Sequence, residues 1–150
     1  MKMDRRQFVL TSAVSMVALS TGSLTAFAAG DPTVADRIKE FTGGAATGEG
    51  KISLTTPEIA ENGNTVPIAV EVDSPMTADN YVESIAIYAD GNPLPDVVTF
   101  NFTAMSGVAA AKTRIRLAKT QNVIAVAKMS DGSFEMTSNQ VKVTIGGCGG

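Results

Sequence analysis

The sequence contains no histidine, no tryptophan and a single cysteine among its 150 residues. Without histidine, the chain cannot build a Ser-His-Asp or Cys-His catalytic centre from its own residues. Histidine-based metal sites are excluded for the same reason, and one cysteine is too few for a thiolate zinc site. No GxxxxGK[ST] loop occurs, and no GxGxxG stands in a βαβ context. We therefore expect no metal, no cofactor and no enzyme activity of the chain's own, which leaves the chemistry of one thiol.

The first 28 residues have the pattern of an export signal. Arg5 and Arg6 precede an apolar run over residues 9–24, and residues 26–28 form the small-x-small motif after which signal peptidase cleaves. The run is rich in Ser and Thr and is shorter than the about 20 apolar residues that a membrane anchor needs. Paired arginines favour the twin-arginine export route of bacteria.

Asp4 stands where a twin-arginine signal usually has Ser or Thr, so an ordinary secretory signal is the alternative. Either route predicts a periplasmic protein. Removal of residues 1–28 takes away three basic residues and one acidic residue, so nine basic and fourteen acidic residues remain and the net charge falls from −3 to −5. Such a charge does not favour binding to nucleic acid or to an anionic membrane.

Residues 29–50 are predicted to contain one short helix and a glycine-rich linker. Val34, Ile38 and Phe41 recur at nearly helical spacing, and Asp31 is a candidate N-cap. The glycine-rich stretch over residues 43–50 then predicts a loop.

Residues 51–145 have the pattern of an all-β domain. Val66, Ile68, Val70 and Val72 alternate with less apolar residues, which is typical of a strand with one buried face. Expected turns cover residues 61–64, 90–93 and 130–133, and the expected strands are 52–54, 66–72, 82–89, 97–102, 112–117, 123–127 and a last strand or pair at 134–136 and 141–145. About seven short strands with frequent turns predict an immunoglobulin-like antiparallel β-sandwich, here without the tryptophan and paired cysteines of antibody domains.

Residues 104–111 form a small, apolar stretch between two expected strands. A buried connection is the favoured interpretation. The alternative is an exposed surface that binds a partner chain, because exposed apolar patches usually mark association sites.

The single thiol lies close to the end of the chain, in a glycine-rich setting. Cys148 is surrounded by Gly146, Gly147, Gly149 and Gly150, which predict a flexible arm over residues 146–150. Fully extended, this arm spans roughly 16–18 Å. A catalytic group must be held within about 0.5 Å of its productive position, which a loose arm cannot do.

A narrow arm can instead carry covalently bound cargo on Cys148 into the tunnels of partner enzymes. Two alternatives remain open. The cysteine is either a chance residue on a tail, or part of a structural binding subunit in which it forms only an intermolecular disulfide.

Several stretches of the chain resemble the SoxY family, the sulfur-carrier subunits of the bacterial thiosulfate-oxidising Sox system. The resemblance is carried by residues 61–67, 84–93, 113–123, 125–133 and, above all, 141–150, which end in the sequence IGGCGG. The twin-arginine leader agrees with it.

The resemblance implies an immunoglobulin-like sandwich that pairs with SoxZ and has no cofactor of its own. It also implies that the haem protein SoxAX joins thiosulfate oxidatively to Cys148, and that SoxB then releases sulfate by hydrolysis. Where SoxCD is present, it oxidises the remaining sulfane sulfur.

Overall fold

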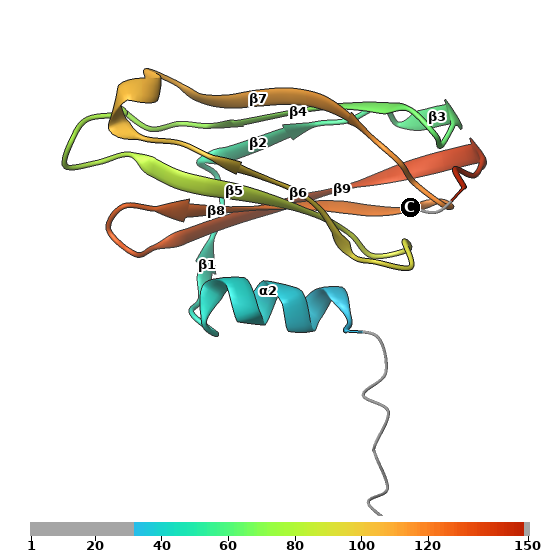
Figure 1. Cartoon of the computed structure of the whole chain (residues 1–150), viewed down its shortest axis with the longest axis horizontal. Helices are drawn as coiled ribbons and strands as arrows, with labels where there is room; N and C mark the ends of the chain where they lie inside the picture. Colours follow the sequence, from blue (N-terminus) through green and yellow to red (C-terminus); the bar gives the residue numbers. More distant parts are fainter. Residues whose placement is uncertain (1–31, 149–150) are drawn as a thin grey trace, which may run out of the picture.

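The computed structural model describes residues 32–148, so the predicted signal over residues 1–28 lies outside the described part. Two β-sheets face each other, and helix α2 (Val34–Thr42) lies outside the larger one (Figure 1). The predicted all-β sandwich with one short helix near its N-terminus is thereby confirmed. Within residues 32–148, no helix has the length and apolar character needed to cross a membrane.

The larger sheet has the strand order β1-β9-β8-β5-β6. Five of its six strands lie on this path: β1 (Thr47–Gly48), β5 (Val82–Ala89), β6 (Asp96–Asn101), β8 (Gln121–Met129) and β9 (Phe134–Ile145). The smaller sheet has the order β2-β4-β7, made of β2 (Ile52–Thr55), β4 (Val66–Val72) and β7 (Ala109–Ile115). Strand β3 (Ile59–Asn62) pairs with the last part of β9.

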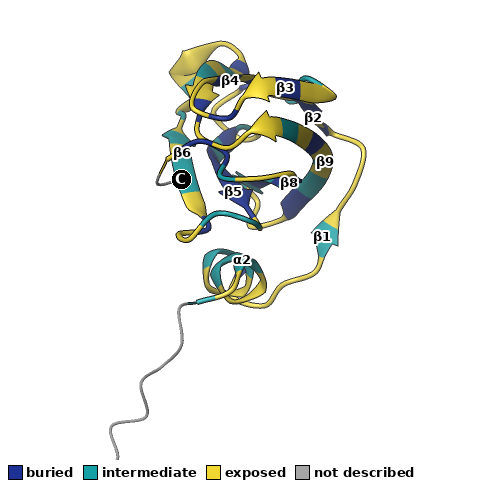
Figure 2. Ribbon diagram, turned by 90° about the vertical axis from the view of Figure 1, so that its right-hand side faces the viewer, coloured by how far each residue is buried: buried dark blue, intermediate teal, exposed yellow. Residues whose placement is uncertain are grey.

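The core lies between the two sheets and follows from the period-2 pattern of the strands. The alternate valines and isoleucine of β4, at positions 66, 68, 70 and 72, are all buried. Opposite them, β5 and β8 contribute Ile85, Ile87 and Val123, which are buried as well. Figure 2 shows β5 in the dark blue of buried residues. Both faces of β5 are largely buried because helix α2 covers its outer side.

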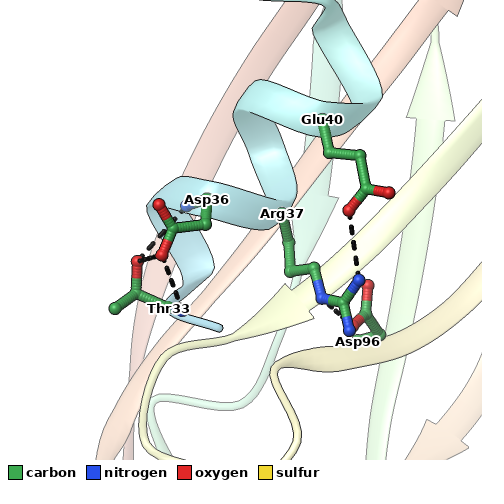
Figure 3. Close-up of polar contacts among 5 residues, drawn as sticks. All are labelled: Thr33, Asp36, Arg37, Glu40 and Asp96. Carbon is green, nitrogen blue, oxygen red and sulfur yellow. Dashed lines mark hydrogen bonds and ion pairs between the residues drawn. The ribbon is translucent and has the colours of Figure 1, made fainter. Parts of the chain in front are cut away.

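Helix α2 packs on the larger sheet with the apolar face that its spacing predicts. Val34, Ile38 and Phe41 contact a second cluster of the sheet, where the rings of Phe41 and Phe134 meet edge to face at 6.0 Å. The predicted N-cap, Asp31, is wrong, because the N-cap is Thr33 and the helix begins at Val34. The Thr33 hydroxyl accepts a hydrogen bond from the Asp36 amide in a capping box (Figure 3). The reciprocal bonds to the Asp36 side chain lower the pKa of that carboxyl.

An ion pair fixes the helix to the edge of the larger sheet. Arg37 Nε lies 2.9 Å from Asp96 Oδ2 on β6, and its Nη1 donates to Glu40 over 3.1 Å (Figure 3). Tyr88 is only 4% exposed in the second cluster beneath the helix. Burial, reinforced by the negative charge of Asp96, raises the pKa of Tyr88 to about 12.

This shift makes the stability of the fold depend on alkaline pH. In the unfolded chain the Tyr88 phenol ionises near its ordinary value of 10.0. The folded state keeps the proton, so its stabilising contribution is complete below pH 10 and is lost as pH rises toward about 12. In the wild type the free energy of unfolding should therefore fall by about 1–3 kcal/mol at alkaline pH, and we expect Tyr88→Phe to abolish this fall. Urea unfolding at pH 9 and pH 11 measures it, and identical pH slopes for both chains would contradict the prediction.

Sequence-based boundaries differ from the structure at four places, and one of them is the predicted strand at residues 112–117, which is observed as β7 at Ala109–Ile115. The predicted turn at residues 61–64 is half strand, because β3 continues to Asn62. Of the predicted last strand or pair, the single strand is correct: β9 is one strand of twelve residues, and it includes residues 137–140, which the prediction left out. The glycine-rich linker contains β1, which pairs in parallel with the start of β9. Strand β3 also pairs in parallel with β9, near the end of that strand. These two parallel pairings, of β1 and of β3 with β9, are additions to the antiparallel sandwich that the sequence predicts.

The stretch at residues 104–111 was predicted to be a buried connection, and most of it is exposed. It crosses from β6 in one sheet to β7 in the other through a short 3-10 turn, Ala104–Ser106. Met105 is 95% exposed and Val108 is 65% exposed. The chain has to leave the core to change sheets, so the prediction of burial is wrong from Met105 to Val108, while Ala109 is buried at the start of β7.

Candidate functional site

The end of β9 leads the chain onto the body of the sandwich instead of away from it. The Gly147 amide donates to the Leu117 carbonyl over 2.9 Å, and the Cys148 amide donates to Asn64 Oδ1 over 3.1 Å. Just before them, the Gly63 amide donates to the Ile145 carbonyl over 2.7 Å. Residues 146–148 are therefore docked by hydrogen bonds in the described conformation.

We call Gly63, Asn64, Leu117 and Ala118 the arm-docking site. Its two segments are joined to each other, because the Leu117 amide donates to the Gly63 carbonyl over 2.8 Å. Gly63 and Asn64 belong to the turn after β3, and Leu117 and Ala118 follow β7. The turn after β3 is shaped by Asn62, whose side chain accepts the Asn64 amide over 2.9 Å. The site thus brings two distant segments together, and residues 146–148 dock on them as a third.

Neighbouring backbone atoms lie so close to Gly63, Gly146 and Gly147 that a side chain at these positions would collide with them. A Cβ atom on Gly146 would lie 2.2 Å from the Ala118 carbonyl oxygen, and one on Gly147 would lie 2.7 Å from the Gly63 carbonyl oxygen. A Cβ on Gly63 would lie 2.2 Å from the Leu117 carbonyl oxygen. Distances below 3.0 Å are not seen for real Cβ atoms, so a side chain at any of these positions requires a shift. None of the three has a positive φ, so space rather than backbone conformation requires glycine.

The sequence predicts that Gly146 and Gly147 belong to a flexible arm, and the structure gives both a second role as packing residues. The flexibility of the arm stays a prediction. Gly149 and Gly150 lie outside the described residues.

The thiol of Cys148 is free and exposed at the end of the docked segment. A partner protein can therefore reach it without any unfolding of the sandwich. Among residues 32–148, no cluster of three or more His, Cys, Asp or Glu side chains could hold a metal ion. The chemistry offered here is that of an accessible sulfur nucleophile on a short, narrow segment.

Cys148 can be identified as a site residue from the sequence alone, and Asn64 cannot. Asn64 was assigned to a turn, and its partner lies 84 positions further along the chain. An Asn-Gly-Asn sequence is common in turns, and no local pattern shows that its side chain holds a distant backbone amide.

We expect Asn64→Ala to loosen the docked segment without harming the fold. Asn64 is exposed, so loss of its hydrogen bond should lower the free energy of unfolding by about 1 kcal/mol at most. The amide of Cys148 should exchange with deuterium several-fold faster, while core amides such as that of Val126 keep their rates. Asn80→Ala, an exposed change in the loop after β4, is the control. Unchanged exchange at Cys148 would show that Asn64 does not hold it.

Comparisons with known proteins agree with this geometry. Residues 38–148 match the family model described as "Sulfur oxidation protein SoxY". The structure of the sulfur carrier protein SoxY from Chlorobium limicola f. thiosulfatophilum superimposes with a TM-score of 0.62 at 31% sequence identity, covering 75% of this chain and 97% of that one. No curated protein sequence matches the chain.

Other similar structures share the fold alone. Superoxide reductase (neelaredoxin) from Ignicoccus hospitalis has a TM-score of 0.56 at 16% identity, covering 63% of this chain and 80% of that one. A putative superoxide reductase from Thermotoga maritima has a TM-score of 0.53 at 19% identity, covering 69% and 89%. The family match spans most of the described residues and includes Cys148, and from this we conclude that the chain belongs to the SoxY family of sulfur oxidation proteins.

Proposed function

We propose that the chain is a periplasmic sulfur carrier that holds thiosulfate-derived sulfur on Cys148 and presents it to the enzymes of a Sox system. The observation that carries the proposal is the position of the chain's one thiol, which is exposed at the end of a segment held mainly by backbone hydrogen bonds. Such a segment can leave the body at the cost of a few hydrogen bonds, each worth about 1 kcal/mol.

The proposed loading step is an oxidation. The Cys148 thiol loses its proton, its sulfur forms an S–S bond with the terminal sulfur of thiosulfate, and two electrons leave. Because we expect no cofactor of the chain's own to accept them, we propose a haem protein of the SoxAX type as the oxidant. The product is a cysteine S-thiosulfonate, in which the sulfonate carries one negative charge.

The proposed unloading step is a hydrolysis. Water attacks the sulfonate sulfur and the S–S bond to it breaks; sulfate and two protons leave, and Cys148 keeps one additional sulfur atom as a persulfide anion. We assign this step to a hydrolase of the SoxB type, and the oxidation of the remaining sulfur to SoxCD where that enzyme is present. In each step the chain supplies the covalent platform, and the partner supplies the catalytic groups.

We further propose that the chain works as a heterodimer with a SoxZ-type subunit. The exposed Met105 and Val108 support a partner-binding surface, which is the alternative that the sequence left open for this loop. Isolated exposed apolar residues are common, so the proposal depends on both lying in one short connection, residues 104–108.

Mass analysis of the C-terminal peptide tests the proposed function. Cleavage after Lys142 releases residues 143–150, which contain Cys148. In protein isolated without reductant from thiosulfate-grown cells, we expect this peptide to carry the mass of a thiosulfate or persulfide adduct that dithiothreitol removes. A peptide that stays unmodified in cells actively oxidising thiosulfate would refute the carrier role.

The same experiment separates the second candidate, a structural subunit that uses Cys148 only for an intermolecular disulfide. That candidate predicts a peptide cross-linked to a partner's cysteine peptide and a complex that separates in reductant. The carrier predicts a complex that survives reductant, because its subunits associate by packing.

A further inference from the structure

The positive charges of the described chain are concentrated in one short segment. Residues 32–148 contain nine basic and thirteen acidic residues. Four of the nine basic residues lie in the segment 112–119, which has no acidic residue; they are Lys112, Arg114, Arg116 and Lys119. The rest of the described chain therefore has five basic residues against thirteen acidic ones. The segment 112–119 is therefore a concentrated positive region on a chain whose remaining residues carry a net negative charge.

The fold presents three of these cations on one exposed face. Strand β7 is the edge strand of the smaller sheet, and Ile115 points into the core. Lys112 and Arg114 alternate with the inward positions of β7, and Arg116 follows the end of the strand, exposed between the buried Ile115 and Leu117. All three are exposed, and none forms an ion pair within the described residues. We call Lys112, Arg114 and Arg116 the basic stripe.

A groove of about 630 Å³ lies beside the stripe on the outer face of the smaller sheet. Small and apolar residues of β4 and of the loop after β2, among them Pro57, Pro67 and Ala69, form its lining, and Lys112 and Arg114 line it from β7. Pro67 is the register partner of Arg114, and Ala69 is that of Lys112. Glu71 is the next outward position on β4 and lies opposite Ala110, beyond the end of the stripe.

The basic segment is continuous with the arm-docking site. Leu117 accepts the Gly147 amide, and the Ala118 carbonyl is the close neighbour of Gly146. These two residues stand between Arg116 and Lys119 in the chain. The Arg116 end of the basic stripe therefore adjoins the arm-docking site along the chain.

We propose that the basic stripe and its groove dock an acidic surface of an enzyme that acts on Cys148, an inference that rests on the proposed function. Charge complementarity selects the occupant, since opposite charges guide encounter and set orientation. Cations at positions 112 to 116 extend over roughly 13 Å at about 3.3 Å per residue. That span and the adjoining groove suit an extended protein surface, because a small anion meets one or two of these cations at most.

Charge reversal with a matched control tests the docking surface. Arg114→Glu is compared with Lys39→Glu, which makes the same change in net charge on helix α2, at a residue outside the ion pairs of the described chain. The substrate is the heterodimer loaded with thiosulfate on Cys148, and sulfate release by the SoxB-type enzyme is measured at low and high salt. We expect Arg114→Glu to lower kcat/KM roughly tenfold at low salt through KM, with kcat kept and the difference reduced by salt. Lys39→Glu should stay within about twofold of the wild type.

The other outcomes overturn the inference. Equal losses in both variants indicate an effect of net charge, and no loss in Arg114→Glu indicates a solvated face. Failure of Arg114→Glu to bind the SoxZ-type subunit assigns the surface to the heterodimer. If Arg114→Glu slows alkylation of Cys148 by iodoacetate but not by iodoacetamide, the cations act on small anions instead. A wild-type chain that is never loaded refutes the proposed function itself, and this is seen before any variant is compared.

Discussion

Replacing Cys148 with serine is expected to abolish covalent sulfur loading of the chain while leaving the fold unchanged. A serine hydroxyl cannot form the S–S bond that holds the cargo, and no other residue of the chain has a thiol. The side chain is exposed, so its replacement removes no buried contact. The bond from this position to Asn64 uses the backbone amide and is available to serine as well. The loss of loading should therefore be complete and purely chemical.

Intact-mass analysis after incubation with thiosulfate and the loading enzyme measures this effect. The matched control moves the thiol instead of deleting it: Cys148→Ser combined with Ser138→Cys places the cysteine on an exposed position of β9. We expect no enzymatic loading of this double variant, because its thiol is fixed on the body and cannot enter a tunnel. A sulfur adduct on Cys148→Ser alone would refute the proposal that Cys148 carries the cargo. An adduct on the double variant would show that the arm is not needed.

The parts of the fold that local pattern determines could be predicted from the sequence. Strands β4 and β8 have burial patterns that follow their apolar residues, and both were predicted at nearly their observed positions. Strand β3 escaped prediction because only Ala60 of its four residues is buried. It is defined by its parallel pairing with β9, more than eighty residues away, and a contact of that kind leaves no local periodicity.

Some residues of the candidate site could also be predicted from the sequence, and others could not. Cys148 was predicted because it is unique in composition, and uniqueness can be seen without a structure. Gly63 was assigned to an ordinary turn, although its carbonyl and amide join three separate segments. Gly146 and Gly147 were assigned to flexibility alone, since glycine's freedom is a local property and its lack of a Cβ matters only beside a neighbour.

Gly63→Ala is expected to lower the stability of the whole domain, whereas Gly147→Ala should mainly detach the arm. Gly63 is buried, and its new Cβ would meet the Leu117 carbonyl oxygen at 2.2 Å and the Gly147 nitrogen at 2.7 Å. Overpacking costs about 1–3 kcal/mol. The hydrogen bonds that Gly63 makes to Ile145 and Leu117 add about 1 kcal/mol each if the shift breaks them. We therefore expect a loss of about 3–5 kcal/mol, against the roughly 5–15 kcal/mol of a typical domain.

Urea unfolding of both variants separates the body from the arm. Gly147 also meets a carbonyl, that of Gly63, but it lies near the chain end, and the segment after Ile145 can swing away to relieve the contact. Gly147→Ala should therefore lower the free energy of unfolding by only about 1–2 kcal/mol, the contribution of the hydrogen bonds that are released. Faster deuterium exchange at Cys148 should accompany it, as in Asn64→Ala. Equal losses in both variants would mean that residues 146–148 are part of the domain core, which is incompatible with a segment that leaves the body to deliver cargo.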